Sequence, residues 1–292
     1  MKKQLEALLQ ERVNHYVSSR DKTTGWYDPS DIQRQVGLLG KRDTELLQVK
    51  AEGLIESIRS RDLSTEVDYN LHYRFLLKQE DAFFIEERIE RRTAYFTEGL
   101  VIEDKERESH TERNEEEIPP IAEGHYEHRL TYRYNRLKAV QYAERWWNQS
   151  NPAYKSFTDN CTNYISQCLH AGGIPMWGRP NKAQGWWMSG NSWSYSWTVS
   201  HALHNLLARG TAIKTQEVNS PRQLYLGDII TYDFQGDGRF DHCTIVTAKD
   251  RRGMPLVNAN TTNSRNRYWA YEDSTAYTPN IKYKFYIILD QS

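Results

Sequence analysis

The chain has 292 residues, of which 38% are hydrophobic and 26% are charged, and its formal net charge is −1. This length suits two average domains or one large one, and the composition is typical of a soluble globular protein with a hydrophobic core. A net charge so close to zero excludes bulk electrostatic attraction to nucleic acid or to an anionic membrane. No apolar run reaches the length of a membrane span.

The N-terminal stretch "MKKQLEALLQERVNHYVSS" has two lysines near its start, but no continuous apolar run follows them. A secretory signal peptide needs such a run, so we expect none here. The chain as given is therefore expected in the cytoplasm, unless it is trimmed or leaves the cell by another route.

In chain order, the first predicted element is a helix over 5–17, where apolar residues recur at 3.6-residue spacing. The apolar residues of 46–58 predict a second helix. Strict alternation over 67–75 predicts a half-buried strand, and Gln79-Glu80-Asp81 predicts a turn into a partner strand over 82–96. Strands of this length are expected to pair antiparallel, with helices on one face.

Residues 102–117 hold almost no apolar groups, and Pro119 and Pro120 follow them. A solvated linker explains this composition better than an acidic tail that binds a partner. We therefore expect residues 1–120 to form a small α+β domain that ends in a charged linker near 102–120. Targeting or binding of a protein partner is its expected role.

Residues 121–292 form the second predicted domain, which contains eight of the nine tryptophans. A strand over 127–134 begins this domain or closes the first one, and helices follow over 136–147 and 199–210. The later strand-like stretches are 227–234, 241–250, 255–260 and 281–289. Helices first and strands afterwards predict an α+β domain, with a helix packed on an antiparallel sheet.

Three cysteines, an odd and small number, exclude a disulfide framework. Cys161 lies in "TDNCTNYISQCLHAGG", where a helical apolar pattern begins at the cysteine and ends at Gly172 and Gly173. The positive end of the helix dipole lowers the pKa of a thiol at this position and makes it a nucleophile. The alternative is that Cys161 is a small buried residue, as most free cysteines are.

A cysteine nucleophile needs a base, and His242 in "RFDHCTIV" enters a predicted strand after a glycine-containing hairpin. Strand alternation directs Cys243 to the face opposite His242, so Cys243 is expected to be structural. The next strand carries Asn258 and Asn260 on one face. Either amide oxygen could accept a hydrogen bond from the imidazole and orient it.

Other polar groups fit a site less well. His170 lies too far along the helix from the thiol, and His201 and His204 lack a carboxylate or thiol partner at useful spacing. The stretch "DFQGDGRFDH" begins like a calcium loop, but Gln235 and Thr244 stand where that loop needs acidic ligands. We expect a hairpin turn there, and no metal or cofactor.

Seven motifs occur in a fixed order along the second domain: "YNRLKAVQYAERWW", "NPAY", "DNCTNYISQCLHAGGIPM", "SWT", "GDII", "DHCTIVT" and "LVNANT". Together they resemble the putative amidase domain of bacterial proteins, a relative of the NlpC/P60 and CHAP groups of papain-like cysteine hydrolases. The resemblance covers residues 132–288. It implies a papain-like α+β fold, in which a cysteine-bearing helix packs on an antiparallel sheet that carries the histidine. It also implies hydrolysis of amide bonds, with peptidoglycan stem peptides as the expected substrate.

Within this resemblance, the nucleophile of the family falls on Cys161 and the base on His242. The third position falls on Asn260, where the family often has histidine; asparagine there gives the Cys–His–Asn set of papain. The family commonly has aspartate directly before the cysteine, whereas here Asn160 separates Asp159 from it.

The implied mechanism is attack of the Cys161 thiolate on an amide carbonyl, with His242 passing the proton to the leaving amine before water hydrolyses the thioester. The backbone N–H of Cys161 and one side-chain donor, Asn160 or Asn163, are expected to hold the oxyanion. Four tryptophans between nucleophile and base either line a substrate groove or pack in the core; they are Trp186, Trp187, Trp193 and Trp197.

Two other functions compete with cell-wall hydrolysis. A non-catalytic protein that binds or assembles the cell wall could keep the fold, although such a protein has no need of a thiol, an imidazole and an amide together. An intracellular deamidase or transferase could use the same thioester chemistry, which agrees with the expected lack of a signal peptide.

Overall fold

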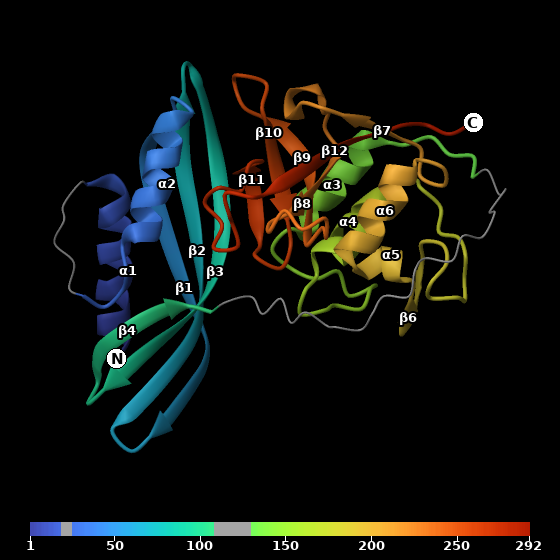
Figure 1. The fold of residues 1–292 in the computed structure, drawn as a ribbon. Coiled ribbons are helices and arrows are strands. Elements are labelled where there is room, and N and C mark those ends of the chain that lie inside the picture. Colours follow the sequence, from blue (N-terminus) through green and yellow to red (C-terminus); the bar gives the residue numbers. More distant parts are fainter. Residues whose placement is uncertain (19–24, 108–129) are drawn as a thin grey trace. The chain divides into compact units, whose positions relative to one another are not determined.

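The structure is a computed structural model that describes residues 1–18, 25–107 and 130–292. It is an α+β protein with antiparallel sheet and six α-helices in the described residues (Figure 1). The chain divides into an N-terminal unit, Met1–Ser109 with Glu272–Thr275, and a C-terminal unit, His110–Tyr271 with Ala276–Ser292. The expected boundary at residue 120 lies outside the described residues. No helix in these ranges is both long and apolar enough to cross a membrane.

The N-terminal unit is an antiparallel meander whose strands follow one another in the chain, with two helices packed on the sheet (Figure 1). Tight two-residue turns join the strands. The elements are α1 (Lys2–Val17), α2 (Ser30–Lys41), β1 (Glu45–Arg61), β2 (Ser64–Gln79), β3 (Ala82–Thr97) and β4 (Leu100–Glu106).

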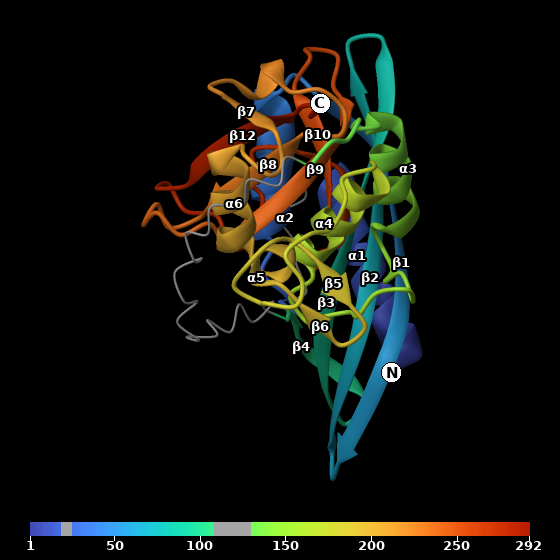
Figure 2. The ribbon, with the colours of Figure 1, turned by 90° about the vertical axis from the view of Figure 1, so that its right-hand side faces the viewer.

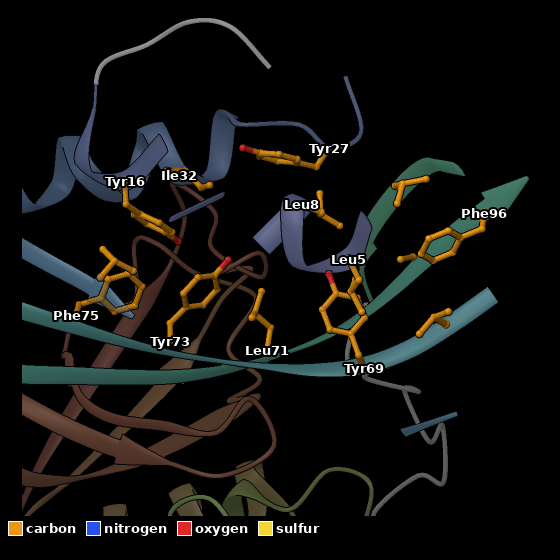
Figure 3. Close-up of a cluster of buried hydrophobic side chains, with 14 of the residues drawn as sticks. Leu5, Leu8, Tyr16, Tyr27, Ile32, Tyr69, Leu71, Tyr73, Phe75 and Phe96 are labelled. Carbon is orange, nitrogen blue, oxygen red and sulfur yellow. The ribbon is translucent and has the colours of Figure 1, made fainter. Parts of the chain in front are cut away.

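Alternation along β2 builds the core of this unit, as the sequence predicts. Tyr69, Leu71 and Tyr73 are fully buried on one face of the strand, where they meet apolar side chains of the two helices, among them Leu8 and Ile32 (Figure 3). The alternating positions bury large apolar surfaces, which holds the register of the sheet because a one-residue slip would expose all of them.

The helix predicted over 46–58 is wrong, because these residues form β1. Irregularities in the pairing of β1 with β2 lie between Leu46 and Gln48 and between Ile55 and Ser57. A bulge inserts an extra residue and shifts the phase of the side chains. The apolar residues therefore lose their period of two and imitate helical spacing.

The charged linker predicted over 102–120 is also wrong in its first part. Residues up to Glu106 belong to β4, which pairs with β3, and Asp104 is only 3% exposed. The rest of that stretch from residue 108 lies outside the described residues.

The helix α2 is not predicted; its first residue, Ser30, donates its N–H and hydroxyl to the carboxylate of Asp28.

A buried ion network lies beneath α1. Arg12 donates to the Tyr73 hydroxyl at 2.7 Å and to Glu90 at 3.2 Å, and Arg92 bonds both Glu90 and Asp104, at 2.9 and 2.8 Å. All five residues are at most 4% exposed. Burial acts to raise the pKa of Glu90, but the surrounding guanidinium groups outweigh it and hold this pKa below its ordinary value. The network therefore ties α1 to the sheet through charges that solvent does not screen.

Replacing Arg12 with methionine is expected to destabilise the N-terminal unit by about 3–5 kcal/mol, because buried carboxylates lose a cationic partner. Urea denaturation that is monitored by hydrogen-exchange mass spectrometry gives the free energy of unfolding of each unit separately. Arg34→Ala is the matched control, since it breaks an exposed ion pair with Asp31 and should cost at most about 1 kcal/mol. Equal losses in the two variants would contradict the role given to the network.

The C-terminal unit packs helices against an antiparallel sheet (Figure 2). The order of its strands is β11-β10-β9-β8-β12-β7. Its helices are α3 (Arg136–Trp146), α4 (Cys161–Ala171), α5 (Tyr195–Thr198) and α6 (Ser200–Arg209), with a 3₁₀ turn at Pro221–Gln223. The strands of the sheet are β7 (Thr215–Val218), β8 (Ile229–Asp233), β9 (His242–Lys249), β10 (Pro255–Ala259), β11 (Ser264–Tyr268) and β12 (Lys282–Ile288). A separate small hairpin joins β5 (Met188–Ser189) to β6 (Ser192–Trp193).

The helix α4 is the central helix of this unit, since it packs against α3 and β9 and its first nine residues are all buried. It ends at Gly172, where a Cβ atom would lie 2.4 Å from the Tyr134 ring, so only glycine fits. The strand predicted over 127–134 is not found in its described part, where Tyr132 makes an isolated bridge to Gln291.

Candidate active site

Cys161 is the first residue of α4, and its side chain is 7% exposed. Asn160 precedes it as the N-cap residue. The backbone N–H groups of Asn160 and Cys161 both donate to the Thr261 hydroxyl, at 2.7 and 3.0 Å. The thiol therefore lies where a helix N-terminus, which favours negative charge, meets the chain that leaves β10.

His242 is the first residue of β9, opposite Tyr232 of β8 in the sheet. Its ring lies beside the rings of Tyr232, Phe234 and Tyr271, with centroids 5.6, 6.1 and 5.1 Å away. Its Nε2 atom is buried, and no polar atom in the described part of the chain bonds it. Aromatic packing therefore surrounds the imidazole on the sheet.

The pKa of the Cys161 thiol lies well below its usual range. The largest cause is hydrogen bonding with the Cys243 thiol; burial acts in the opposite direction, and hydrogen bonding and charge from His242 lower this pKa further. Both sulfur atoms contact the Thr162 hydroxyl, Cys161 Sγ at 3.7 Å and Cys243 Sγ at 3.6 Å. Burial raises the pKa of Cys243. Of the two thiols, Cys161 is therefore the one that ionises.

His242 and Cys243 have different surroundings, as strand alternation predicts. The His242 ring packs beside Tyr232, Phe234 and Tyr271, whereas Cys243 Sγ contacts the Thr162 hydroxyl of α4. Both side chains nevertheless lower the pKa of Cys161. Cys243 thus belongs to the surroundings of the thiol rather than to a remote core.

Neither asparagine proposed to orient His242 bonds it. Asn260 donates to the Trp146 and Trp147 carbonyl oxygens at 3.4 and 3.2 Å, and its Oδ1 accepts from the Asn160 amide at 2.9 Å. It therefore ties the end of β10 to α3 and to the start of α4.

Asn258 has its own full set of partners. Its Oδ1 accepts from the Thr247 hydroxyl at 2.8 Å and from the Asn266 N–H at 2.9 Å, and its Nδ2 donates to Glu144 at 2.7 Å. The structure thus gives both asparagines positioning contacts between strands and helices, and the hydrogen bond expected from the imidazole is not formed.

The predicted oxyanion donors are only partly available. The N–H of Cys161 already donates to Thr261. Asn163 uses both amide protons, on Asn160 Oδ1 at 2.8 Å and on the Lys155 carbonyl at 2.9 Å. Asn160 uses one of its two amide protons, on Asn260. Of the two amides considered, Asn160 is therefore the one that retains a donor.

Three of the four tryptophans proposed for a substrate groove are core residues. Trp186, Trp187 and Trp197 are at most 2% exposed, and the indoles of Trp186 and Trp197 donate to Ser166 and to Asn163. Trp193 alone of the four is partly exposed. The groove prediction fails for the first three because their side chains are buried, which sequence spacing does not reveal.

The calcium-like stretch is a turn. Asp233 accepts backbone N–H groups from Gly236, Asp237 and Gly238 at 2.7, 3.3 and 2.8 Å, which occupies its carboxylate. Within the ranges that the structure describes, no group of three His, Cys, Asp or Glu side chains could hold a metal ion.

Sequence reasoning missed two residues beside the nucleophile, Cys243 and Thr261. The hydroxyl of Thr261 binds the start of α4, although the two are 100 residues apart in the chain. The stretch "LVNANT" marks this position only as a strand end. Its proximity to the thiol follows from the packing of α4 against the sheet, which no local pattern encodes.

Comparison with known proteins gives one family match, which includes this region, and two relatives. The family described as "Putative amidase domain" matches residues 133–286. The chain is 46% identical to the uncharacterized protein YhbB of Bacillus subtilis over 99% of this chain and 96% of that protein. It is 29% identical to the uncharacterized protein YjcM of the same organism over 46% of this chain and 32% of that protein. No solved structure gives a significant match.

Iodoacetamide at about pH 7 should label Cys161 faster than Cys168 or Cys243, because burial raises the pKa of both other thiols and only the thiolate reacts. Peptide mass spectrometry of the native protein gives the three rates. Faster labelling of Cys168 would contradict the ionisation assigned to Cys161.

Cys243→Ala removes the largest cause of the lowered Cys161 pKa. We expect the pKa of Cys161 to rise in this variant. The alkylation rate of Cys161 should then begin to increase only at a higher pH than in the wild type. The measurement is the pH profile of labelling at Cys161. Cys168→Ala is the control and should have the same pH dependence of Cys161 labelling as the wild type. If Cys243→Ala also has the wild-type pH dependence, Cys243 does not lower the pKa of Cys161.

Proposed function

The chain belongs to the family of the putative amidase domain, and from that premise we propose that it is a cysteine hydrolase that cleaves amide bonds through a thioester on Cys161. The observation that carries the proposal is the combination of a buried thiol at a helix N-terminus with a lowered pKa and a neighbouring imidazole. A structural cysteine in a core has the opposite property, since burial alone raises the pKa of a thiol.

The proposed reaction has two halves. The Cys161 thiolate attacks the amide carbonyl, and the protonated imidazole of His242 donates its proton to the nitrogen that leaves. Water, deprotonated by His242, then hydrolyses the thioester and releases the acid. The lowered pKa of the thiol supports the first step, because it increases the fraction of the thiolate, which is the form that attacks.

The arrangement of elements supports a papain-like assignment. A helix that begins with the nucleophile packs against a strand of an antiparallel sheet that begins with the base. Neither Asn258 nor Asn260 orients the imidazole by a hydrogen bond, so the proposal assigns that task to packing against Tyr232 and Tyr271. The catalytic set is then a Cys161–His242 pair.

Peptidoglycan stem peptides are the proposed substrate, on the resemblance to NlpC/P60 and CHAP hydrolases. A partly exposed aromatic surface supports this choice: Trp193 and Phe157 meet edge to face at 4.8 Å, with the ammonium groups of Lys155 and Lys182 at 4.6 and 5.2 Å from the indole centre. Phe157 donates its N–H to Asn160, which joins this surface to the start of α4. Aromatic faces with nearby cations suit peptides that carry carboxylates.

Digestion of purified peptidoglycan by the wild type and by Cys161→Ala tests the function. We expect fragments from the wild type alone, because the alanine variant lacks the nucleophile. Mass spectrometry of the fragments identifies the amide bond that is cut. His242→Ala should be nearly as inactive as Cys161→Ala, since both residues act on the same step.

Intact peptidoglycan in the wild-type reaction would contradict this substrate. If Cys161 then still reacts with iodoacetamide, the result favours an intracellular deamidase or transferase. If Cys161 does not react, the result favours a protein that binds or assembles the cell wall. Localisation of the native protein separates the wall from the cytoplasm. Targeting or partner binding by the N-terminal unit stays a prediction.

Trp193→Ala should raise KM for soluble stem-peptide fragments about fivefold and leave kcat nearly unchanged, because an aromatic contact far from the reacting bond contributes to binding. Steady-state kinetics measure both constants. Tyr225→Ala, which removes another exposed aromatic ring, is the matched control. Equal KM values for the two variants would remove Trp193 from the binding surface.

A further inference from the structure

The hydroxyl of Thr261 has an unusual set of partners. Its oxygen accepts two backbone N–H groups, those of Asn160 and Cys161, at 2.7 and 3.0 Å. A hydroxyl has two acceptor positions and one proton to donate. Both acceptor positions are therefore occupied, and the proton must point away from the helix. In the described residues, no acceptor bonds that proton.

The backbone of Thr261 is held in a costly conformation. Its φ is +103°, a region that a β-branched residue rarely adopts. Neighbouring contacts impose it: the N–H of Thr261 donates to Asn263 Oδ1 at 3.2 Å, and Asn260 is anchored to α3 and to Asn160. Strain of this kind persists where the surrounding structure fixes a residue, and it clusters at functional sites.

We propose that Thr261 is a catalytic residue whose hydroxyl donates a hydrogen bond to the oxyanion of the tetrahedral intermediate, beside the unused amide proton of Asn160. This inference rests on the proposed function, because only acyl chemistry at Cys161 creates that oxyanion. The N–H of Cys161, which the sequence suggested for the task, acts through Thr261: it holds and polarises the hydroxyl that faces the substrate.

In the reaction, the bond from Cys161 Sγ to the carbonyl carbon forms while the π electrons of the carbonyl move to its oxygen. Thr261 stabilises that negative charge without giving up its proton. When the electrons return, the carbon–nitrogen bond breaks and His242 supplies the proton to the amine. The two N–H groups at the helix start raise the donor strength of the hydroxyl, since hydrogen bonds in a chain polarise one another.

In a competing role, the Thr261 hydroxyl only fills the oxyanion-binding position while no substrate is bound. In that case the N–H groups of Asn160 and Cys161 are the true donors, and removal of the hydroxyl would free them. The two roles predict opposite changes. Loss of the hydroxyl weakens oxyanion binding if Thr261 donates, and preserves or strengthens oxyanion binding if Thr261 only occupies the place.

The test uses the full chain with Thr261→Val, which keeps the shape of threonine without its hydroxyl, and Thr261→Ser, which keeps the hydroxyl. The probe is an N-acetyl amino aldehyde, which adds to a cysteine thiolate and places an oxygen where the oxyanion forms. Its affinity is measured as protection of Cys161 from iodoacetamide. Alkylation by iodoacetamide creates no oxyanion, so the alkylation rate without aldehyde reports whether the nucleophile and the fold are intact.

We expect Thr261→Val to alkylate at a rate close to wild type while its affinity for the aldehyde and its kcat on peptidoglycan fragments both fall about 10²–10³-fold. Thr261→Ser should restore most of both. Thr262→Val removes the neighbouring hydroxyl and should change neither. Wild-type or tighter aldehyde binding by Thr261→Val would overturn the inference. If peptidoglycan stays intact but aldehyde binding still depends on Thr261, the proposed substrate fails and the inference stands.

Discussion

The candidate site depends on one junction, where the end of β10 is bound to the N-terminus of α4. Thr261 and Asn260 come from the sheet side and Asn160 and Cys161 from the helix side, and three hydrogen bonds join them. This junction binds the helix that carries the thiol to the end of β10, which is the neighbour of the strand that carries His242. Because the four residues are buried or nearly so, each bond lies in a medium of low dielectric, where it is stronger than in water.

Two chemical requirements meet at this junction. A thiolate needs donors and positive potential, which the helix start and His242 provide. A helix start also needs acceptors for its unpaired N–H groups, and an acceptor close to the thiol would compete for the same space. A threonine hydroxyl meets both requirements, since it accepts from the helix and still has one proton to donate. Aspartate, a usual cap, would present a full negative charge at that point. Asparagine would accept through its oxygen and could donate only from its separate amide nitrogen, not from the atom that accepts.

The parts that sequence predicts well are those with a local signature. Cys161 lies at a helix start marked by polar residues before and glycines after, and alternation along β2 gives the core of the N-terminal unit. Helix α4 and the strands β8, β9, β10 and β12 follow for the same reason, whereas β7 and β11 are not predicted. Bulges defeat the local pattern in β1. Contacts between distant segments, such as Thr261 with the helix start and Cys243 with the thiol, depend on how α4 packs on the sheet and carry no mark in the sequence.

The strand order of the C-terminal unit has a consequence for how its sheet is completed. In space, β12 lies between β8 and β7, although it follows both of them, and β9 to β11, along the chain. Until β12 is present, one edge of β8 has no neighbour, and pairings so distant in sequence form slowly because a long loop must close first. A nascent chain that lacks β12 therefore has an open sheet beneath α4. The sheet on which α4 packs is therefore complete only after β12 has been added.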